Sequence, residues 1–440
     1  MNYAVADNLL EIYWLATEND PVVLAARQTQ LAEAEQLVIS RSKILPNIAF
    51  SGVQNYDKQK DRLYGFQNTG YNFKNYSLSI TQPIFQIVDW MNYSASQKQT
   101  LSSLKRYEET EQNLILRVAQ QYFAVLSAID QLETSKSAKQ AFAKRLEQAT
   151  QQFKVGVAAI TDINDAQARL DTARAKEIAD HNALTTAKEG LSQIVGRYID
   201  NISLLKLQIP LVAPDPAQIE PWIEKARQYN IKLQATKLEV EVSRQMIKVS
   251  SAGHLPTLGL SGRLLRAKYP PANVSSRQEK TATKELSVNL DLPIFSGGAV
   301  VASTQAAIFK SNAALQQLEA AYREAESNTR IAYNSVLTQI SQVEALKQSV
   351  KSNKIALKAT QAAFEVGTRT IVDVLNSQSD LLNTQRDYAK ARYDYIINSL
   401  KLKQATGSLS VLDLEQVNNL LEHIAPEKTA TEVKETTQSN

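Results

Sequence analysis

Residues 45–52, Leu-Pro-Asn-Ile-Ala-Phe-Ser-Gly, return in altered form at residues 255–262, Leu-Pro-Thr-Leu-Gly-Leu-Ser-Gly. The stretch Gln-Pro-Ile-Phe at 82–85 likewise returns as Leu-Pro-Ile-Phe at 292–295, and both pairs lie 210 positions apart. Chance could produce one such pair, but not an ordered series with a constant offset. The chain therefore contains an internal structural repeat.

The repeat divides the 440-residue chain into two halves. Phe-Lys-Val-Gly at 153–156 matches Phe-Glu-Val-Gly at 364–367 with an offset of 211, so the series continues far into each half. We predict a first repeat over residues 1–210 and a second over residues 211–425, each ordered as helix, two strands, long helix and helix. Residues 426–440 are polar, and we expect them to be disordered.

Each half is expected to contain a very long helix. No proline or glycine occurs between Pro83 and Gly156, or between Gly298 and Gly367. A helix over about 86–153 would be about 100 Å long at ~1.5 Å per residue. Apolar residues along both helices step by threes and fours, which indicates a coiled-coil seam that needs neighbouring helices. They are Val118, Tyr122, Val125, Ile129 and Leu132 in the first, and Tyr333, Val336, Ile340, Val343, Leu346 and Val350 in the second.

Four short segments alternate apolar and polar side chains with the period of a strand. In the last of them, Leu286, Val288 and Leu290 point one way, while Ser287 and Asn289 point the other. Segments around 48–50, 76–81 and 258–264 alternate similarly, and the polar stretches Asp57–Asn75 and Arg266–Lys284 are interpreted as hairpin loops. A sheet with one apolar and one polar face fits between lipid and water.

The apolar face of this sheet lacks a cover, because each strand adjoins a helix too long to fold back over it. Two β-hairpins packed on a helical core remain the simpler interpretation of the pattern alone. Lipid would cover the face, but four strands cannot close a barrel, and open edges are not tolerated in hydrocarbon. Three chains would supply about twelve strands, within the range of membrane barrels.

Composition excludes several classes of protein. The net charge is +4 and the basic residues are scattered, which gives nucleic-acid binding little support. There are no cysteines, and His181, His254 and His423 lie far apart without ligand spacing, so we expect no metal and no cofactor. The sequence has no nucleophile–base pairing and no phosphate-binding glycine loop, and we predict that the protein is not an enzyme.

No apolar run reaches the ~18–20 residues of a membrane-spanning helix. Met1 and Asn2 lead directly into a helical pattern without a signal peptide. We interpret the sequence as a mature domain from which the export signal is missing.

Two segments resemble the signature turn of TolC-like outer-membrane efflux proteins. One is Val-Gly-Thr-Arg-Thr-Ile-Val-Asp-Val-Leu-Asn at 366–376, and the other is Val-Gly-Val-Ala-Ala-Ile-Thr-Asp-Ile at 155–163. With the repeat and the helix lengths, the resemblance covers about residues 5–425. It implies a mainly α fold with a small transmembrane β part. Long coiled-coil helical hairpins would form a tunnel, and four strands per chain would contribute to a trimeric 12-stranded β-barrel.

The resemblance also assigns roles to residues near the two turns. The turn glycines would let antiparallel helices reverse tightly, which alone accounts for their presence. In the family the same tips contact a periplasmic adaptor. The corresponding residues are Val155, Gly156 and Val157 in the first turn, and Val366, Gly367 and Thr368 in the second.

Polar links that hold similar channels shut map here to Thr161, Asp162 and Arg369. Relatives often carry tyrosine where this chain has Phe364, so the hydrogen bond of that hydroxyl cannot form here. An ordinary surface salt bridge between Asp162 and Arg369 is the alternative interpretation, and it would contribute little stability.

A constriction ring is implied at Asp373 and Asn376, where family members carry acidic residues. Only Asp373 is acidic here, and three copies of it around a narrow pore would still make a negative ring. The alternative is a helix N-terminal charge that interacts favourably with the helix dipole, and the residues alone favour it.

The function implied is a passive outer-membrane channel, the exit duct of a tripartite efflux pump or a type I secretion system, gated at its periplasmic end. The chain would form a homotrimer. Its other partners would be a periplasmic adaptor, an inner-membrane RND or ABC transporter, and outer-membrane lipid. It would lie in the Gram-negative outer membrane and extend into the periplasm. A soluble coiled-coil scaffold is the alternative; it would share the heptads but leave the four amphipathic strands unexplained.

Overall fold

The computed structural model describes residues 7–61, 67–156, 159–268 and 279–422, apart from the side chains of residues 57–72. The chain divides into two compact units, and each draws on both halves of the sequence. Unit 1 comprises Met1–Arg27, Arg106–Leu233 and Ala321–Asn440, and unit 2 comprises Gln28–Lys105 and Gln234–Ala320. Val157, His423 and the predicted disordered tail over 426–440 lie outside the described residues.

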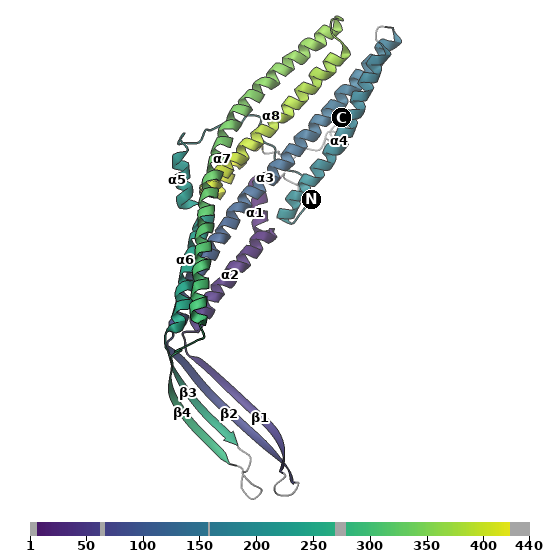
Figure 1. Cartoon of the computed structure of the whole chain (residues 1–440). Coiled ribbons are helices and arrows are strands. Elements are labelled where there is room, and N and C mark those ends of the chain that lie inside the picture. Colours follow the sequence, from purple (N-terminus) through teal and green to yellow (C-terminus); the bar gives the residue numbers. More distant parts are fainter. Residues whose placement is uncertain (1–6, 62–66, 157–158, 269–278, 423–440) are drawn as a thin grey trace, which may run out of the picture. The chain divides into compact units, whose positions relative to one another are not determined.

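The helices and strands follow one another along the chain as Figure 1 shows. The helices are α1 (Leu9–Asn19), α2 (Pro21–Ser42), α3 (Ile87–Lys154), α4 (Ile160–Val195), α5 (Glu220–Tyr229), α6 (Ile231–Ser251), α7 (Ala299–Glu365), α8 (Ile371–Ala405) and α9 (Val411–Asn418), with a short 3-10 helix over Ala252–His254. The strands are β1 (Asn47–Asp61), β2 (Gln67–Phe85), β3 (Thr257–Lys268) and β4 (Lys280–Asp291).

The core of unit 1 forms around the predicted coiled-coil seams. Val118, Tyr122 and Val125 of α3 are buried, as are Tyr333 and Val336 of α7. They belong to one apolar cluster with residues of α1, α4, α8 and α9. Burial of these side chains, rather than helix propensity, is what stabilises such long helices.

The segment that follows α9 pairs with the link between the repeats. Leu205 and Leu421 form an antiparallel bridge, and the Glu422 N–H donates to the Leu204 carbonyl at 2.7 Å. Arg392 of α8 is buried and donates to the Lys206 carbonyl at 2.9 Å. These bonds attach the irregular link to the helices of unit 1.

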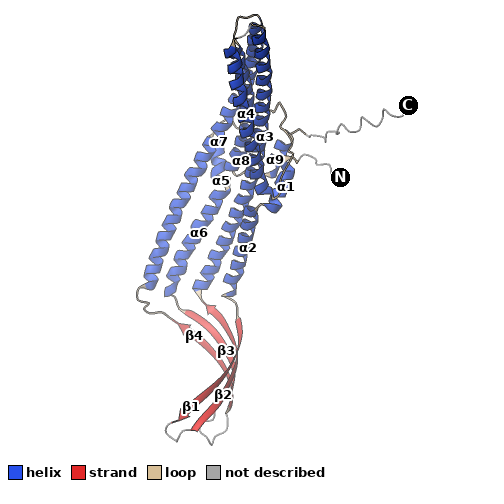
Figure 2. Cartoon of the chain, turned by 90° about the vertical axis from the view of Figure 1, so that its right-hand side faces the viewer, coloured by secondary structure: helices blue, strands red, loops and turns tan. Residues whose placement is uncertain are grey.

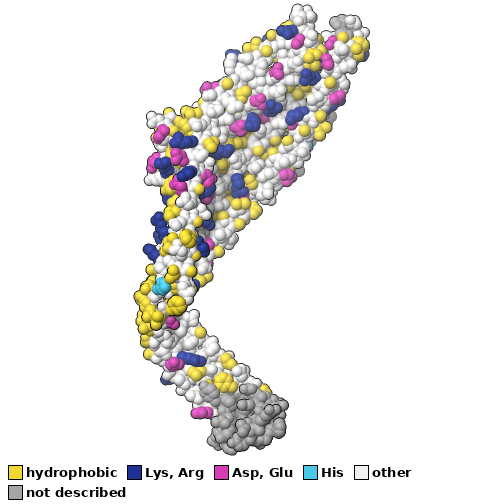
Figure 3. Space-filling model, viewed as in Figure 1, with side chains coloured by type: hydrophobic (Ala, Val, Ile, Leu, Met, Phe, Trp, Pro, Cys, Tyr) yellow, Lys and Arg dark blue, Asp and Glu magenta, His cyan; other side chains and the backbone are white. Residues whose placement is uncertain are grey.

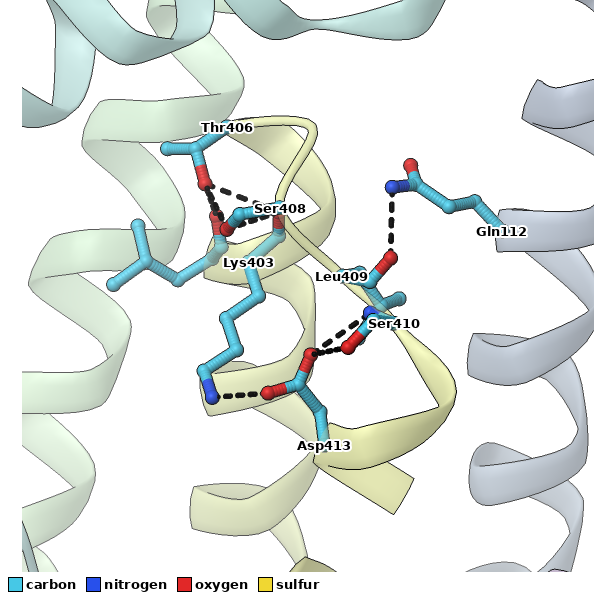
Figure 4. A network of polar contacts seen from close by, with 8 residues as sticks. Gln112, Lys403, Thr406, Ser408, Leu409, Ser410 and Asp413 are labelled. Carbon is cyan, nitrogen blue, oxygen red and sulfur yellow. Dashed lines mark hydrogen bonds and ion pairs between the residues drawn. The ribbon is translucent and has the colours of Figure 1, made fainter. Parts of the chain in front are cut away.

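The chain between α8 and α9 is fixed by a small polar network (Figure 4). Lys403 pairs with Asp413, whose second oxygen accepts from the Ser410 N–H at 2.8 Å. Gln112 of α3 donates to the Leu409 carbonyl at 3.0 Å. The network therefore holds the start of α9 against both α8 and α3.

In unit 2, α2, the first part of α3, α6 and the first part of α7 form a layer (Figure 2). Their order in this layer is the order of the four strands in the sheet. Ser40 of α2 bonds Ser96 of α3 at 2.6 Å, and Ser102 of α3 donates to the Ala235 carbonyl of α6 at 3.3 Å. Ser243 of α6 bonds Ser311 of α7 at 3.2 Å. Because small side chains line these contacts, the helices can approach closely. Along the chain, α2 leads to β1, β2 leads to α3, α6 leads to β3, and β4 leads to α7.

The sheet is antiparallel throughout, and its register separates two faces. Phe50 is opposite Leu78, Leu78 is opposite Leu264, and Gly262 is opposite Leu286, so these residues share one face. Phe50, Leu264 and Leu286 are 71%, 51% and 77% exposed. The predicted alternation is thus confirmed, and no described part of the chain covers the apolar face.

The strands are longer than the sequence predicted. Residues 57–61, 67–75, 266–268 and 280–284, interpreted as hairpin loops, continue the ladder as strand. The polar composition of these stretches suggested loops. Backbone pairing, however, does not require apolar side chains, and it extends beyond the apolar part of the sheet.

Candidate gate at the two hairpin turns

The two long hairpins reverse through the same backbone conformation. Gly156, between α3 and α4, has φ 76°, and Gly367, between α7 and α8, has φ 78°. Their N–H groups donate to the carbonyls of Phe153 and Phe364 at 2.9 and 3.0 Å. A Cβ at either glycine would meet no other atom within 4 Å. Left-handed backbone, and not lack of space, therefore requires glycine at both turns.

The N-terminus of α8 is closed by a capping box. The Asp373 carboxylate accepts from the N–H and the hydroxyl of Thr370, both at 2.9 Å, and the Asp373 N–H donates to the Thr370 hydroxyl at 3.3 Å. The Thr370 backbone bond lowers the pKa of Asp373, with help from the Thr370 hydroxyl and the nearby Arg369. Asp373 thus has the helix-capping role that the residues alone favoured. Its charge is retained.

The N-terminus of α4 is closed less completely. Asp162 occupies the position equivalent to Asp373 and accepts from the Ala159 N–H at 3.2 Å. Ala159 has no polar side chain with which to return a hydrogen bond. Thr161 is exposed beside it.

Arg369 lies two residues before α8 and beside the first turn of that helix. Its guanidinium is 3.9 Å from the Asp373 carboxylate, and the side chain is 62% exposed. Among the residues that the structure describes, no bond or ion pair joins Asp162 or Thr161 to Arg369. The predicted role of Thr161, Asp162 and Arg369 as gate links stays a prediction.

Phe364 occupies an apolar site between the two hairpins. It is half-buried and packs against a cluster that contains Phe142 of α3, Leu170 of α4 and Leu375 of α8. It also packs against a second cluster, which contains Val374 of α8. The ring therefore contributes packing where a tyrosine would add a hydroxyl.

Asn376 is bonded across the hairpins, which the sequence did not predict. Arg169 of α4 donates to the Asn376 side-chain oxygen of α8 at 2.9 Å. The two residues lie 207 positions apart, and no motif or periodicity connects them. Only the folded chain brings them together.

A buried carboxylate between α3 and α4 was also missed. Asp180 is 2% exposed and accepts from Gln131 at 2.6 Å and from Lys176 at 2.8 Å. An aspartate in a polar helix normally indicates a solvated surface, so no sequence signal pointed to this buried position. Its bond to Gln131 of α3 helps fix the pairing of the first hairpin.

The tips themselves present apolar side chains to solvent. Val155 is 73% exposed and Val366 is 75% exposed. The Thr368 N–H and hydroxyl donate to the Ala363 carbonyl at 2.9 and 3.0 Å, which completes the second turn. Exposed apolar residues on a rigid turn suit contact with another protein.

Comparison with known proteins decides the family. The model of the outer membrane efflux protein family matches residues 12–197 and 222–408. The chain belongs to the outer membrane efflux protein family. The double match covers most of the chain and falls on both sides of the link that joins the two predicted repeats.

Full-length relatives agree with this assignment. The outer membrane protein TolC of Vibrio cholerae is 38% identical, with 94% of this chain and 93% of that protein covered. The alkaline protease secretion protein AprF of Pseudomonas aeruginosa is 28% identical, with 94% and 87% covered. The solved structure of CusC shares the fold, with a TM-score of 0.79 at 16% identity and 92% and 93% coverage.

This family member is an outer-membrane channel that extends into the periplasm, an exit duct of efflux or type I secretion systems. It is a conduit and not an enzyme. None of the described helices combines the length and apolar character needed to cross a membrane. Within the described part of the chain, no cluster of three histidine or acidic side chains is placed to hold a metal ion.

Proposed function

We propose that three copies of the chain form one channel, and that its periplasmic end rests closed at the two hairpin turns. The trimer is inferred from the edges of the sheet. In the strand order β1-β2-β3-β4, the described β1 and β4 each pair on one side only. Unpaired strand edges are not tolerated in hydrocarbon, so β1 of one copy would pair with β4 of the next. Three copies give about twelve strands.

Light scattering of the detergent-solubilised protein tests the trimer, with a mass of three chains expected. A monomer with a folded sheet would refute it. The lipid-facing side is tested separately by two neighbouring substitutions in β4. Val288→Arg should impair membrane insertion by about 2–4 kcal/mol near the bilayer midplane, whereas Asn289→Arg on the polar face should be tolerated. Equal effects at both positions would refute the facing.

Within one copy, the exposed Arg169–Asn376 hydrogen bond, which ties α4 to α8, supports the gate proposal. The packing of Phe364 supports it, because this ring contacts clusters that span both hairpins. Between neighbouring copies, Thr161, Asp162 and Arg369 would supply further links from the exposed turn surfaces. Each exposed link is weak, but three symmetric copies act together.

Single-channel conductance in planar bilayers tests this gate. The double variant Arg369→Ser, Asp162→Ala should raise conductance, because it removes the links between copies. The double variant Asp171→Ala, Arg174→Ser is the matched control. It removes an exposed ion pair of 3.0 Å between two residues of α4, the helix that also carries Asp162. Unaltered conductance in the first variant would mean that closure is held by the coiled-coil seams instead.

The proposed constriction ring consists of Asp373 alone. Its capping bonds keep the carboxylate ionised, whereas Asn376 adds no charge and is bonded to the cationic Arg169. The closed pore should therefore be cation-selective and open to block by multivalent cations, but more weakly than a ring of two carboxylates. If Asp373→Ala leaves selectivity and block unchanged, this ring does not exist.

The tips would be the contact site of a periplasmic adaptor that recruits an inner-membrane RND or ABC transporter. Val155 and Val366 supply exposed apolar side chains for this contact. Because the chain has no cysteine, Val366→Cys creates a unique site for a crosslinker. The variant should crosslink to the adaptor in cells, while Leu412→Cys, an exposed position on α9, should not. Crosslinking through Leu412→Cys but not through Val366→Cys would show that the adaptor contacts another surface.

A further inference from the structure

Three lysines form one row across the sheet. Lys74 of β2 is opposite Lys268 of β3, and Lys268 is opposite Lys280 of β4. Residues that are directly opposite share a face, with Cβ atoms about 4.5–5.5 Å apart. The row therefore concentrates three positive charges on one side of the sheet.

Two further cations lie on the same face. Arg266 is two residues from Lys268 along β3, and Lys284 is opposite Leu264 on β4. Leu264 belongs to the exposed apolar face. Five cations thus border the apolar face toward the end of the sheet that lies away from the helices.

This face offers the cations no acidic partner. None of its described side chains on the four strands is acidic, as the register and sequence show. The opposite face differs, because Arg263 there is directly opposite Glu285. Like charges in a cross-strand row repel one another. An anion from outside the chain would relieve this repulsion.

Four of the five cations, all but Lys284, line a shallow depression of about 270 Å³. Its lining includes Lys74, Tyr76, Arg266, Lys268 and Lys280. The aliphatic stems of these side chains and the Tyr76 ring can pack on acyl chains while the charged groups reach a headgroup. The site is therefore suited to an amphiphile rather than to a free ion.

The distance of the cations from the helix end of the sheet corresponds to the far surface of a membrane. Helices join the strands at the opposite end, since β1 follows α2 and β4 leads to α7. Lys280 is ten residues from the exposed Leu290 along β4, or roughly 24 Å for a strand tilted by 45°. The rings of Phe50 and Tyr76 stack with their centroids 6.4 Å apart, close to the cations. Aromatic side chains of this kind are typical of the membrane interface of a barrel.

An opposite, apolar band lies at the helix end of the same unit. Yellow side chains gather where the strands meet the helices in Figure 3, and Leu292, Ile294 and Phe295 there are 55%, 93% and 86% exposed. Among the described side chains of the lipid-facing surface, the cations thus lie toward the outer end of the sheet. That end meets the outer leaflet.

We propose that Lys74, Arg266, Lys268 and Lys280 bind the phosphate groups of a phosphorylated lipid in the outer leaflet of the outer membrane. Charge complementarity identifies the headgroup, and the adjoining apolar face identifies the acyl chains. The site is independent of the gate at the hairpin turns. It depends only on the outer-membrane location of the channel.

The test measures binding of bisphosphorylated lipid A to the full-length channel in neutral detergent by native mass spectrometry. The triple variant K74Q/K268Q/K280Q should lose on the order of 100-fold in affinity, because each basic residue near an anionic lipid surface contributes roughly a fivefold factor. K43Q/K248Q/K310Q alters three exposed lysines of unit 2, one directly after α2 and one each in α6 and α7, so it changes the net charge equally and should bind as the wild type does.

Two further measurements identify the ligand. Lipid A without phosphates should bind the wild-type channel as weakly as bisphosphorylated lipid A binds the triple variant. Millimolar inorganic phosphate should not displace the lipid. Displacement would show a small-anion site and overturn the proposal, as would wild-type affinity in the triple variant or an equal loss in the charge-matched control. If the triple variant does not assemble, K268Q alone should still lose about fivefold, and an unchanged affinity there would also overturn it.

Discussion

The two hairpin turns of the chain have the same backbone conformation but are held by different side-chain contacts. Gly156 and Gly367 share a left-handed backbone conformation, and Asp162 and Asp373 close the helices that follow. The second turn adds the Thr370 hydroxyl to its cap, whereas the first has an alanine at that position. The equivalent residues thus differ in how many bonds they make.

The aromatic residue before each glycine differs as well. Phe153 is 43% exposed, whereas Phe364 packs against two apolar clusters that include residues of α3, α4 and α8. A shared backbone motif therefore makes a turn, while side-chain contacts decide how firmly that turn is anchored. We expect the first turn to have the lower local stability of the two.

The largest expected difference concerns these aromatic rings. Phe364→Ala should lower the local stability of the second turn by about 2 kcal/mol, because a half-buried ring loses part of the 3–5 kcal/mol typical of a buried one. Phe153→Ala should change the first turn much less. Hydrogen exchange of amides in the two turns measures both. Equal acceleration would remove the proposed difference in anchoring.

The helix caps offer a reciprocal exchange. Thr370→Ala removes the hydroxyl that accepts from the Asp373 N–H and should destabilise the start of α8 by about 1 kcal/mol. Ala159→Thr should stabilise the start of α4 by a similar amount, because Asp162 is already in place. Exchange rates of the amides in the first turn of each helix report the result. No gain at α4 would show that its turn geometry prevents a capping box.

Acid should affect the second turn through Asp373. Because hydrogen bonds from Thr370 lower the pKa of this carboxyl, its contribution is fully present above the unfolded value of about 3.9 and is lost as pH falls through the lowered folded pKa. Protection of the α8 start should thus persist at pH 5 and decline only below about 4. Asp373→Asn should abolish this dependence, whereas Asp162→Asn should leave the α8 profile unaltered.

The smallest expected effect is that of the bond between the hairpins. Arg169→Gln should cost about 0.5 kcal/mol or less, because the bond to Asn376 is exposed. Its effect should nevertheless appear as slightly higher conductance if the link helps to hold the gate closed. Arg174→Gln on the same helix is the control, since Arg174 pairs with Asp171, three residues away on α4. Equal conductance in both variants would exclude Arg169 from the gate.

The sequence predicted much of the fold because the relevant signals are local or periodic. The absence of proline and glycine predicted α3 and α7, and threes-and-fours spacing predicted the buried seam at Val118 and Tyr122. Period-two alternation predicted the two faces of the sheet. It failed for the strand ends, where polar residues such as Lys280 continue the backbone ladder.

Within the candidate site, the amino-acid sequence by itself determined the two turns, because a left-handed backbone selects glycine and a helix N-terminus selects residues such as Thr370 and Asp373. Only the tertiary structure decided which distant groups meet. Arg169 and Asn376 are joined by helix packing, and the row of lysines is produced by strand register. Neither contact has a sequence period, since both depend on how separate elements align in space.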